Sequence, residues 1–164
     1  MIRARSVERM VRCRRVWLRS AALTLATGLI AAGALAAGDV RLPGLHGGQL
    51  TSAELAKGDT VVVVWASWSP RCRDIVDRVN AIQSKWGARA RVVAVDFQED
   101  SSKIEEFLRG KNLAVPVYLD SDGAFSKSMA VTSLPGLVVF HGGNPTYQGK
   151  LPADVDATLT AAFH

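Results

Sequence analysis

One short stretch of the chain has the residue types and spacing of thiol chemistry. Residues 65–72 read WASWSPRC and follow the apolar run TVVVV at 60–64. A thiol in the first turn of a helix is well placed for nucleophilic chemistry, because the partial positive charge there stabilises the thiolate. Cys72 is the one thiol of this stretch, since Ser69 stands where a second cysteine would complete a Cys-x-x-Cys pair. The stretch therefore predicts one-thiol chemistry or a frame that has lost its redox function.

The elements that position this stretch follow a regular order along the chain. Residues 38–50 read as short extended pieces, and a capping-box pattern predicts one helical turn at 51–55. The later pattern predicts a buried strand at 59–66, a helix at 70–87, a strand at 90–97, a helix at 101–112, a strand at 114–120 placed at a sheet edge by Pro116, a short helix at 123–131, a hairpin at 136–151 and a helix at 152–163. A β-α-β unit followed by a β-β-α unit predicts an α/β fold, a central mixed sheet with helices on both faces.

This order and two motifs resemble the thioredoxin fold. More narrowly, they resemble the exported TlpA/ResA-type thiol–disulfide oxidoreductases, whose signature is close to W-A-x-W-C-x-x-C. The matching residues are Trp65, Ala66, Trp68, Pro70 and Cys72. A second motif, VTSLPG at 131–136 followed by LVVF and a Gly-Gly turn, resembles the cis-proline loop and last hairpin of that family. The resemblance covers roughly residues 40–164.

The resemblance also implies a surface that binds an extended protein segment. Pro135 would be the cis-proline facing the active loop, and the backbone of Leu134 would offer hydrogen bonds to a partner strand. Trp68 and Leu134 would form an apolar rim. Pro70 and Arg71 would complete the loop side of the surface.

Ser69 is the departure that decides the chemistry. In the family, its position carries the attacking cysteine, and the position of Cys72 carries the resolving one. A dithiol reductase needs both sulfurs, because one attacks the substrate disulfide and the other releases the mixed disulfide. We therefore expect no dithiol reductase activity. Many thioredoxin-like proteins also keep a buried acid in the preceding strand, and its matching place here is the apolar Val63.

Ser69 and Cys72 then need other interpretations. A serine before Pro70 is a suitable N-cap, and its hydroxyl could accept from the backbone N–H of Cys72, which stabilises a helix by about 1 kcal/mol. Arg71 and Arg73 beside Cys72 favour a thiolate, whereas burial would raise the pKa of the thiol. We favour a buried, unreactive Cys72. The acids of DFQED at 96–100 are expected in a solvated loop.

The first residues indicate export. Residues 1–37 combine arginines with the uncharged run 21–37, as in a signal peptide, and the domain is expected at 38–164. Both a Sec signal and a twin-arginine signal fit the Arg14-Arg15 pair, and an uncleaved anchor at 16–38 is the alternative. Residues 1–36 hold seven arginines and one glutamate, which leaves 13 basic and 14 acidic side chains in the rest. That balance gives no basis for binding nucleic acid.

Three functions follow from these patterns. The first is an extracytoplasmic, periplasmic binding protein that holds an extended segment of another protein during envelope folding or assembly. The second is a monothiol oxidoreductase that uses Cys72 and an external resolving thiol. The third is a structural subunit of a membrane complex, anchored through 16–38. The scattered histidines lack metal-ligand spacing, and no cofactor or metal is expected.

Overall fold

The structure is a computed structural model that describes residues 39–163. The predicted leader at 1–37, the proposed anchor at 16–38 and Cys13 lie outside the described residues. Within the described part of the chain, no helix combines the length and apolar character that a membrane crossing requires.

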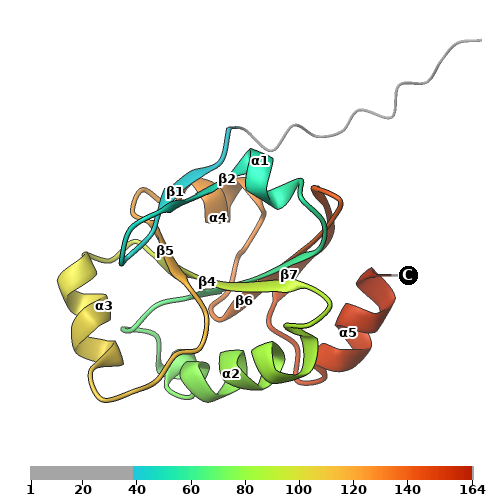
Figure 1. The fold of residues 1–164 in the computed structure, drawn as a ribbon. Helices are drawn as coiled ribbons and strands as arrows, with labels where there is room; N and C mark the ends of the chain where they lie inside the picture. The colour runs from blue at the N-terminus through green and yellow to red at the C-terminus, as the bar shows by residue number, and fades with distance from the viewer. Residues whose placement is uncertain (1–38, 164) are drawn as a thin grey trace, which may run out of the picture. The chain divides into compact units, whose positions relative to one another are not determined.

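A five-stranded mixed sheet forms the centre of the domain (Figure 1). Its strands, in spatial order, are β5 (Val117–Asp120), β4 (Arg91–Phe97), β3 (Thr60–Trp65), β6 (Gly136–His141) and β7 (Asn144–Lys150). Strand β3 runs parallel to β4 and β4 parallel to β5, whereas β6 is antiparallel to both β3 and β7. The mixed sheet predicted from the element order is therefore present, with β3 at its centre.

Helices and a hairpin cover the two faces of the sheet (Figure 1). One face packs against residues of α2 (Ile75–Trp86), α3 (Ser101–Leu108) and α5 (Val155–Ala162). The other face packs against the hairpin of β1 (Arg41–Pro43) and β2 (Gln49–Thr51), α1 (Ser52–Leu55) and α4 (Ala124–Ser128). The short extended pieces and the single helical turn that the sequence predicts before β3 are thus both formed.

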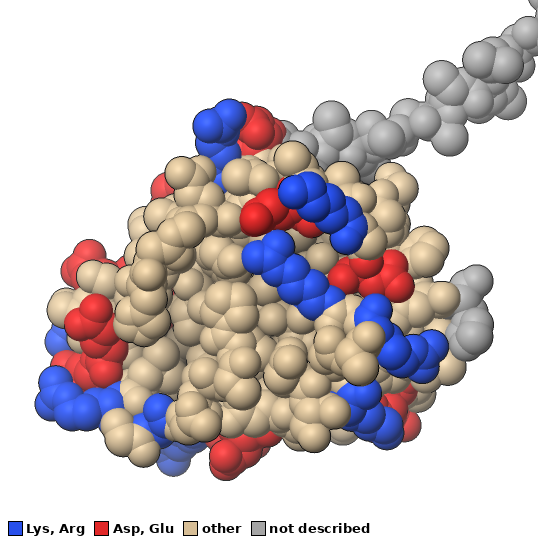
Figure 2. All heavy atoms as spheres, viewed as in Figure 1, with Lys and Arg blue, Asp and Glu red and all other residues tan. Residues whose placement is uncertain are grey.

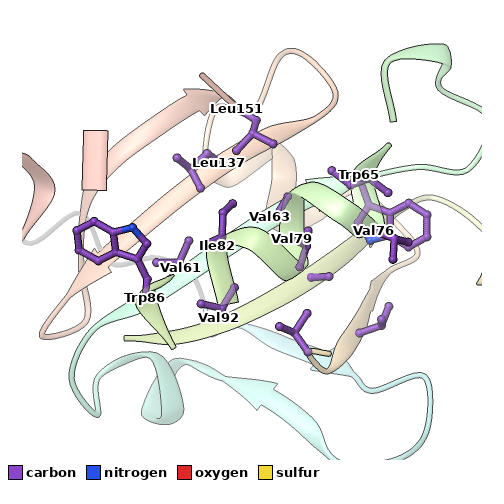
Figure 3. Close-up of a cluster of buried hydrophobic side chains, with 14 of the residues drawn as sticks. Val61, Val63, Trp65, Val76, Val79, Ile82, Trp86, Val92, Leu137 and Leu151 are labelled. Atoms are coloured by element: carbon purple, nitrogen blue, oxygen red, sulfur yellow. The ribbon is translucent and has the colours of Figure 1, made fainter. Parts of the chain in front are cut away.

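The alternation of side chains along β3 separates two hydrophobic cores. All six residues of β3 are buried, because the strand is covered on both faces. Val61, Val63 and Trp65 point into the core beneath α2, and Val62 and Val64 point into the opposite core. Figure 3 shows the α2 side of this arrangement, with labelled residues Val61, Val63, Trp65, Val76, Val79, Ile82, Trp86, Val92, Leu137 and Leu151.

The two edge strands differ in how they are protected. Strand β5 begins one residue after Pro116, which confirms the predicted edge position, and an isolated bridge between Gly44 and Tyr118 covers part of it. Strand β7 exposes alternate residues, and its pairing with β6 is irregular beside Phe140, opposite Pro145. A proline and an irregular register both disfavour pairing with another chain.

Several predicted elements are shorter than expected, among them the helices predicted at 123–131 and 152–163, which are Ala124–Ser128 and Val155–Ala162. The helix predicted at 70–87 is divided into a 3₁₀ turn, η1 (Pro70–Cys72), and α2, which starts at Ile75. The helix predicted at 101–112 ends at Leu108, because Arg109 has the extended ψ of 123°. The strand predicted at 114–120 starts only at Val117, after Pro116.

The charged side chains are mixed in sign on the face that Figure 2 shows. Lys and Arg lie next to Asp and Glu along its edge and across its upper part, and a broad area without charged groups lies in its middle and to the left. Neighbouring charges of opposite sign give no extended field of one sign across this face.

Truncation of a side chain in the core beneath α2 is expected to destabilise the domain strongly. Leu137 in β6 is fully buried, so Leu137→Ala should lower the free energy of unfolding by about 2–5 kcal/mol. Leu108→Ala is the matched control, because Leu108 is only partly buried at the end of α3 and should cost clearly less. Urea denaturation measures both, and equal losses would contradict this packing.

Candidate functional site

The loop after β3 is built by backbone hydrogen bonds. The Ser69 N–H donates to the Ala66 carbonyl at 3.2 Å, and the Cys72 N–H donates to the Ser69 carbonyl at 2.9 Å. Ser69 occupies the N-cap position of η1, but its hydroxyl makes no capping bond. The predicted hydroxyl cap is therefore wrong. In this 3₁₀ turn the Ser69 carbonyl already takes the N–H that the hydroxyl was expected to bind.

Cys72 lies inside the core beneath α2. Its exposed fraction is 0%, and it is the free cysteine among the described residues. It belongs to the same cluster of buried side chains as Trp65 and Ile75. The structure thus confirms the burial expected from its place in the turn, and the sulfur is shielded from a partner at the surface.

A cavity of about 470 Å³ opens beside the loop. It is lined by Trp68, Ser69, Pro70, Arg71, Phe97, Ser126, Val131, Thr132, Ser133 and Leu134. Five of the residues selected from the sequence are therefore brought together, while Cys72 and Pro135 are not part of the lining. Trp68 forms an exposed rim, with 60% of its surface accessible, whereas Ser69 is only 6% exposed.

The loop before β6 forms the opposite wall of the cavity. The peptide bond between Leu134 and Pro135 is cis, and the Pro135 carbonyl accepts from the Leu151 N–H at 2.8 Å. Within residues 39–163, neither the N–H nor the carbonyl of Leu134 has a backbone hydrogen-bond partner. A free backbone donor and acceptor at the surface can pair with the backbone of an added strand.

Ser126 contributes a buried hydroxyl to the cavity wall. The Asp120 carboxylate holds it in place, accepting from the Phe125 N–H at 3.0 Å and the Ser126 N–H at 2.9 Å. These bonds satisfy two N–H groups at the start of α4, where Gly123 offers no side chain to cap the helix. The Ser126 Oγ has no partner of its own among the described residues. Sequence reasoning missed this residue.

Two acids behind the loop after β3 lie in surroundings other than those predicted from the sequence. Asp96 and Glu99 were expected in a solvated loop, but Asp96 is only 1% exposed and pairs in register with Trp65. The Glu99 carboxylate reaches the loop itself. It accepts from both the N–H and the hydroxyl of Ser67, at 2.5 Å each.

The pKa of Asp96 is raised to about 8. Burial is the largest cause, because it removes the charged form from water, and the neighbouring carboxyl of Glu99 and the charge of Asp120 add to it. A contact with the Glu99 backbone N–H offsets the rise only in part. Val63 is apolar, as the sequence indicates, yet the next strand supplies a buried acid on the same face of the sheet. The alternation of β4 could have located it, since Asp96 follows Ala94 in phase.

Metal chemistry has no evident site here. Within residues 39–163, no group of three His, Cys, Asp or Glu side chains is arranged to hold a metal ion.

Comparisons with known proteins agree with this architecture. The sequence model of the family described as Redoxin matches residues 31–141. The thioredoxin-like protein YneN of Bacillus subtilis is 28% identical over 80 residues, which are 46% of this chain and 47% of YneN. The match thus spans about half the length of that relative.

Two solved structures extend the likeness to the fold. The structure described as the thiol:disulfide interchange protein DsbE of Chlorobium tepidum is 27% identical, with a TM-score of 0.66, and the match covers 77% of this chain and 94% of that one. The pneumococcal exposed lipoprotein thioredoxin Etrx1 of Streptococcus pneumoniae is 19% identical, with a TM-score of 0.66 and coverage of 76% and 98%.

The raised pKa of Asp96 predicts an unusual pH dependence of stability. Between about pH 4 and 8 the folded chain keeps a proton that the unfolded chain has released, so unfolding releases a proton. This group therefore lowers the free energy of unfolding as pH rises, by at most about 1.4 kcal/mol per pH unit, and has no further effect above pH 8.

Asp96→Asn isolates this contribution. The stability of the variant relative to the wild type should rise steadily from pH 5 to 8 in urea denaturation. Asp100→Asn, which changes an exposed acid of the same loop, should give a constant difference. Parallel curves for Asp96→Asn and wild type would show that Asp96 is ionised in the folded chain.

Proposed function

The chain belongs to the redoxin family, and we propose that it is an exported, TlpA/ResA-like member that binds an extended protein segment without dithiol chemistry of its own. The observation that carries this proposal is the combination at the loop. Ser69 presents a hydroxyl at the position that carries the attacking sulfur in related proteins, while the cavity beside it, called the groove below, is present and open to a partner.

The chain lacks the two electrons that disulfide reduction requires. Reducing a substrate disulfide takes two electrons, which a dithiol supplies as it becomes a disulfide. Ser69 has no accessible oxidation states, and Cys72 has no second cysteine beside it among the described residues. A Cys72 sulfur attacking alone would remain in a mixed disulfide until an external thiol released it.

The binding part of the proposal is supported by the two walls of the cavity. Trp68 and Leu134 offer apolar surface, and the Leu134 backbone offers an unpaired donor and acceptor. An extended segment could add its backbone to Leu134 while one of its side chains entered the cavity. Backbone pairing supplies affinity with little sequence preference, which suits a protein that handles unfolded or assembling chains.

Export is supported by the residues before the domain. The arginine-rich start and the uncharged run 21–37 fit a bacterial export signal. We therefore place the domain outside the cytoplasm, in the periplasm or at the cell envelope, where it would assist folding or assembly of an envelope protein.

The monothiol alternative is less well supported. A reactive cysteine needs both a thiolate and an approach for the substrate sulfur, but the Cys72 sulfur is buried and lies outside the cavity lining. Rapid alkylation of Cys72 in the folded chain would favour the monothiol reaction over binding alone.

Restoring the missing sulfur should create activity. We expect that the wild-type chain does not accelerate insulin reduction by dithiothreitol. Ser69→Cys should accelerate it clearly, because the new thiol lies one turn from Cys72, which can then release the mixed disulfide. Ser133→Cys is the matched control, since it adds a thiol to the same cavity outside the turn that holds residues 69 and 72. Turnover by the wild type, or equal turnover by both variants, would contradict the proposal.

Removing the aromatic rim should weaken binding. The probe is carboxymethylated, permanently unfolded α-lactalbumin, which contains no disulfide. Trp68→Ala should reduce its affinity at least about tenfold, as expected for an exposed aromatic anchor. Arg73→Ala changes an exposed residue outside the cavity lining and should leave the affinity unchanged. Calorimetry that detects no difference between the two variants would place the binding surface elsewhere.

A further inference from the structure

A tight turn brings two acids together behind the loop. Gln98 lies between Asp96 and Glu99. Its φ of 58° is in the left-handed region, which residues other than glycine rarely adopt. Its N–H donates to the Asp120 carbonyl at 3.1 Å, which fixes the turn to the end of β5. The turn reverses the chain, so that the Glu99 carboxyl group comes within reach of both Asp96 and Ser67.

Glu99 ties this turn to the loop of residues 66–72. Both of its carboxylate oxygens are used, one by the Ser67 N–H and one by the Ser67 hydroxyl. Ser67 lies between Ala66, whose carbonyl accepts from the Ser69 N–H, and the exposed Trp68. The contact with Glu99 therefore fixes the position of the chain where the cavity wall begins. Hydrogen bonds to an ionised carboxylate are about twice as strong as neutral ones.

Asp96 is left with no suitable donor. Both of its carboxylate oxygens are inaccessible to solvent and have no hydrogen-bond partner among residues 39–163. An ionised carboxylate in that place would be costly, whereas a protonated one carries no charge to desolvate. The neighbouring Glu99 carboxylate makes ionisation of Asp96 still less favourable, because like charges repel.

We propose that the buried Asp96 stays protonated beside the Glu99 carboxylate and that this pair positions the loop of residues 66–72 through Ser67. While the proton is bound, Asp96 is neutral and Glu99 carries the one negative charge that binds Ser67. When the proton leaves to solvent, two adjacent carboxylates repel each other. Glu99, the less buried of the two, then turns toward solvent and releases Ser67.

The surroundings of Asp96 contain no competing cation. From β5 the charged neighbour is Asp120, and from the turn it is Glu99, both acidic. On the η1 side, the titratable group of the same core is the Cys72 thiol. Strand β3 contributes Trp65, which is paired with Asp96 in register and whose indole packs on Phe107 of α3. No Lys, Arg or His of residues 39–163 forms an ion pair with Asp96.

The consequence for the groove rests on the proposed function. Loss of the proton should loosen the wall that carries Trp68 and Ser69, so that an extended segment binds more weakly in alkaline conditions. The pair is therefore a positioning device that makes the shape of the groove sensitive to pH.

Carboxyl titration by NMR tests the pair directly in the full chain. With ¹³C-labelled Asp, the Asp96 carboxyl carbon and the Ser67 amide should shift with one midpoint near pH 8. One unit above that midpoint, about one tenth of the molecules should retain the proton. The Trp65 indole N–H has no hydrogen-bond partner and lies beside Asp96, so its signal should report the same transition.

The variants separate positioning from a merely structural role. Asp96→Asn should abolish the pH transition at Ser67, and Asp100→Asn should leave it unchanged. A Ser67 signal that is constant through the Asp96 midpoint, or that still titrates in Asp96→Asn, would overturn the proposal. If Asp96→Asn does not fold, the wild-type titration alone decides whether Asp96 and Ser67 share a midpoint.

This result is distinguishable from failure of the proposed function. The titration involves no partner, so a shared midpoint would stand even if carboxymethylated α-lactalbumin did not bind at any pH. Where that probe binds, its affinity should be lower at pH 9 than at pH 6.5 in the wild type and equal at both in Asp96→Asn. An unchanged wild-type affinity would show that the pair does not control the groove.

Discussion

The burial of β3 on both faces is the constraint on which the site depends. Its valines are divided between two cores, so a shift by one residue would move every side chain of the strand into the opposite core and would force the large Trp65 side chain into the space of a valine. This fixed register determines where the chain leaves the sheet after Trp65. The loop with Ser69 and Cys72 begins there, and its position relative to the Leu134 wall follows from the pairing of β3 with β6.

The same burial separates the two residues of greatest chemical interest. Ser69 lies at the cavity, where a partner can approach, and Cys72 lies one turn further on, inside the core. A sulfur in the second place serves as a resolving thiol only when another sulfur occupies the first. Under the proposed function, a hydroxyl there leaves a surface that can receive a partner segment but no electrons with which to reduce it. A buried free cysteine then behaves mainly as a small apolar side chain.

The sequence predicted those features that depend on one segment or on a motif. The uninterrupted valines indicated β3, Pro116 indicated the edge position of β5, and Cys72 was expected to be buried. The predictions failed where tertiary contacts decide. The hydroxyl of Ser69 makes no cap because the Cys72 N–H donates to the Ser69 carbonyl instead. Asp96 is buried because it lies on the face of the sheet that α2 and α3 cover. The clamp of Glu99 on Ser67 joins residues 32 apart, and no local pattern reveals such a contact.

The central claim is that the groove holds its partner by shape and backbone pairing and not through sulfur. The most direct measurement compares the affinity of wild type and Cys72→Ala for a disulfide-containing unfolded protein, with adducts examined by mass spectrometry before and after reduction. We expect equal affinities for the two folded proteins and no thiol-sensitive adduct. Binding that disappears with Cys72, together with a wild-type adduct that dithiothreitol releases, would contradict it.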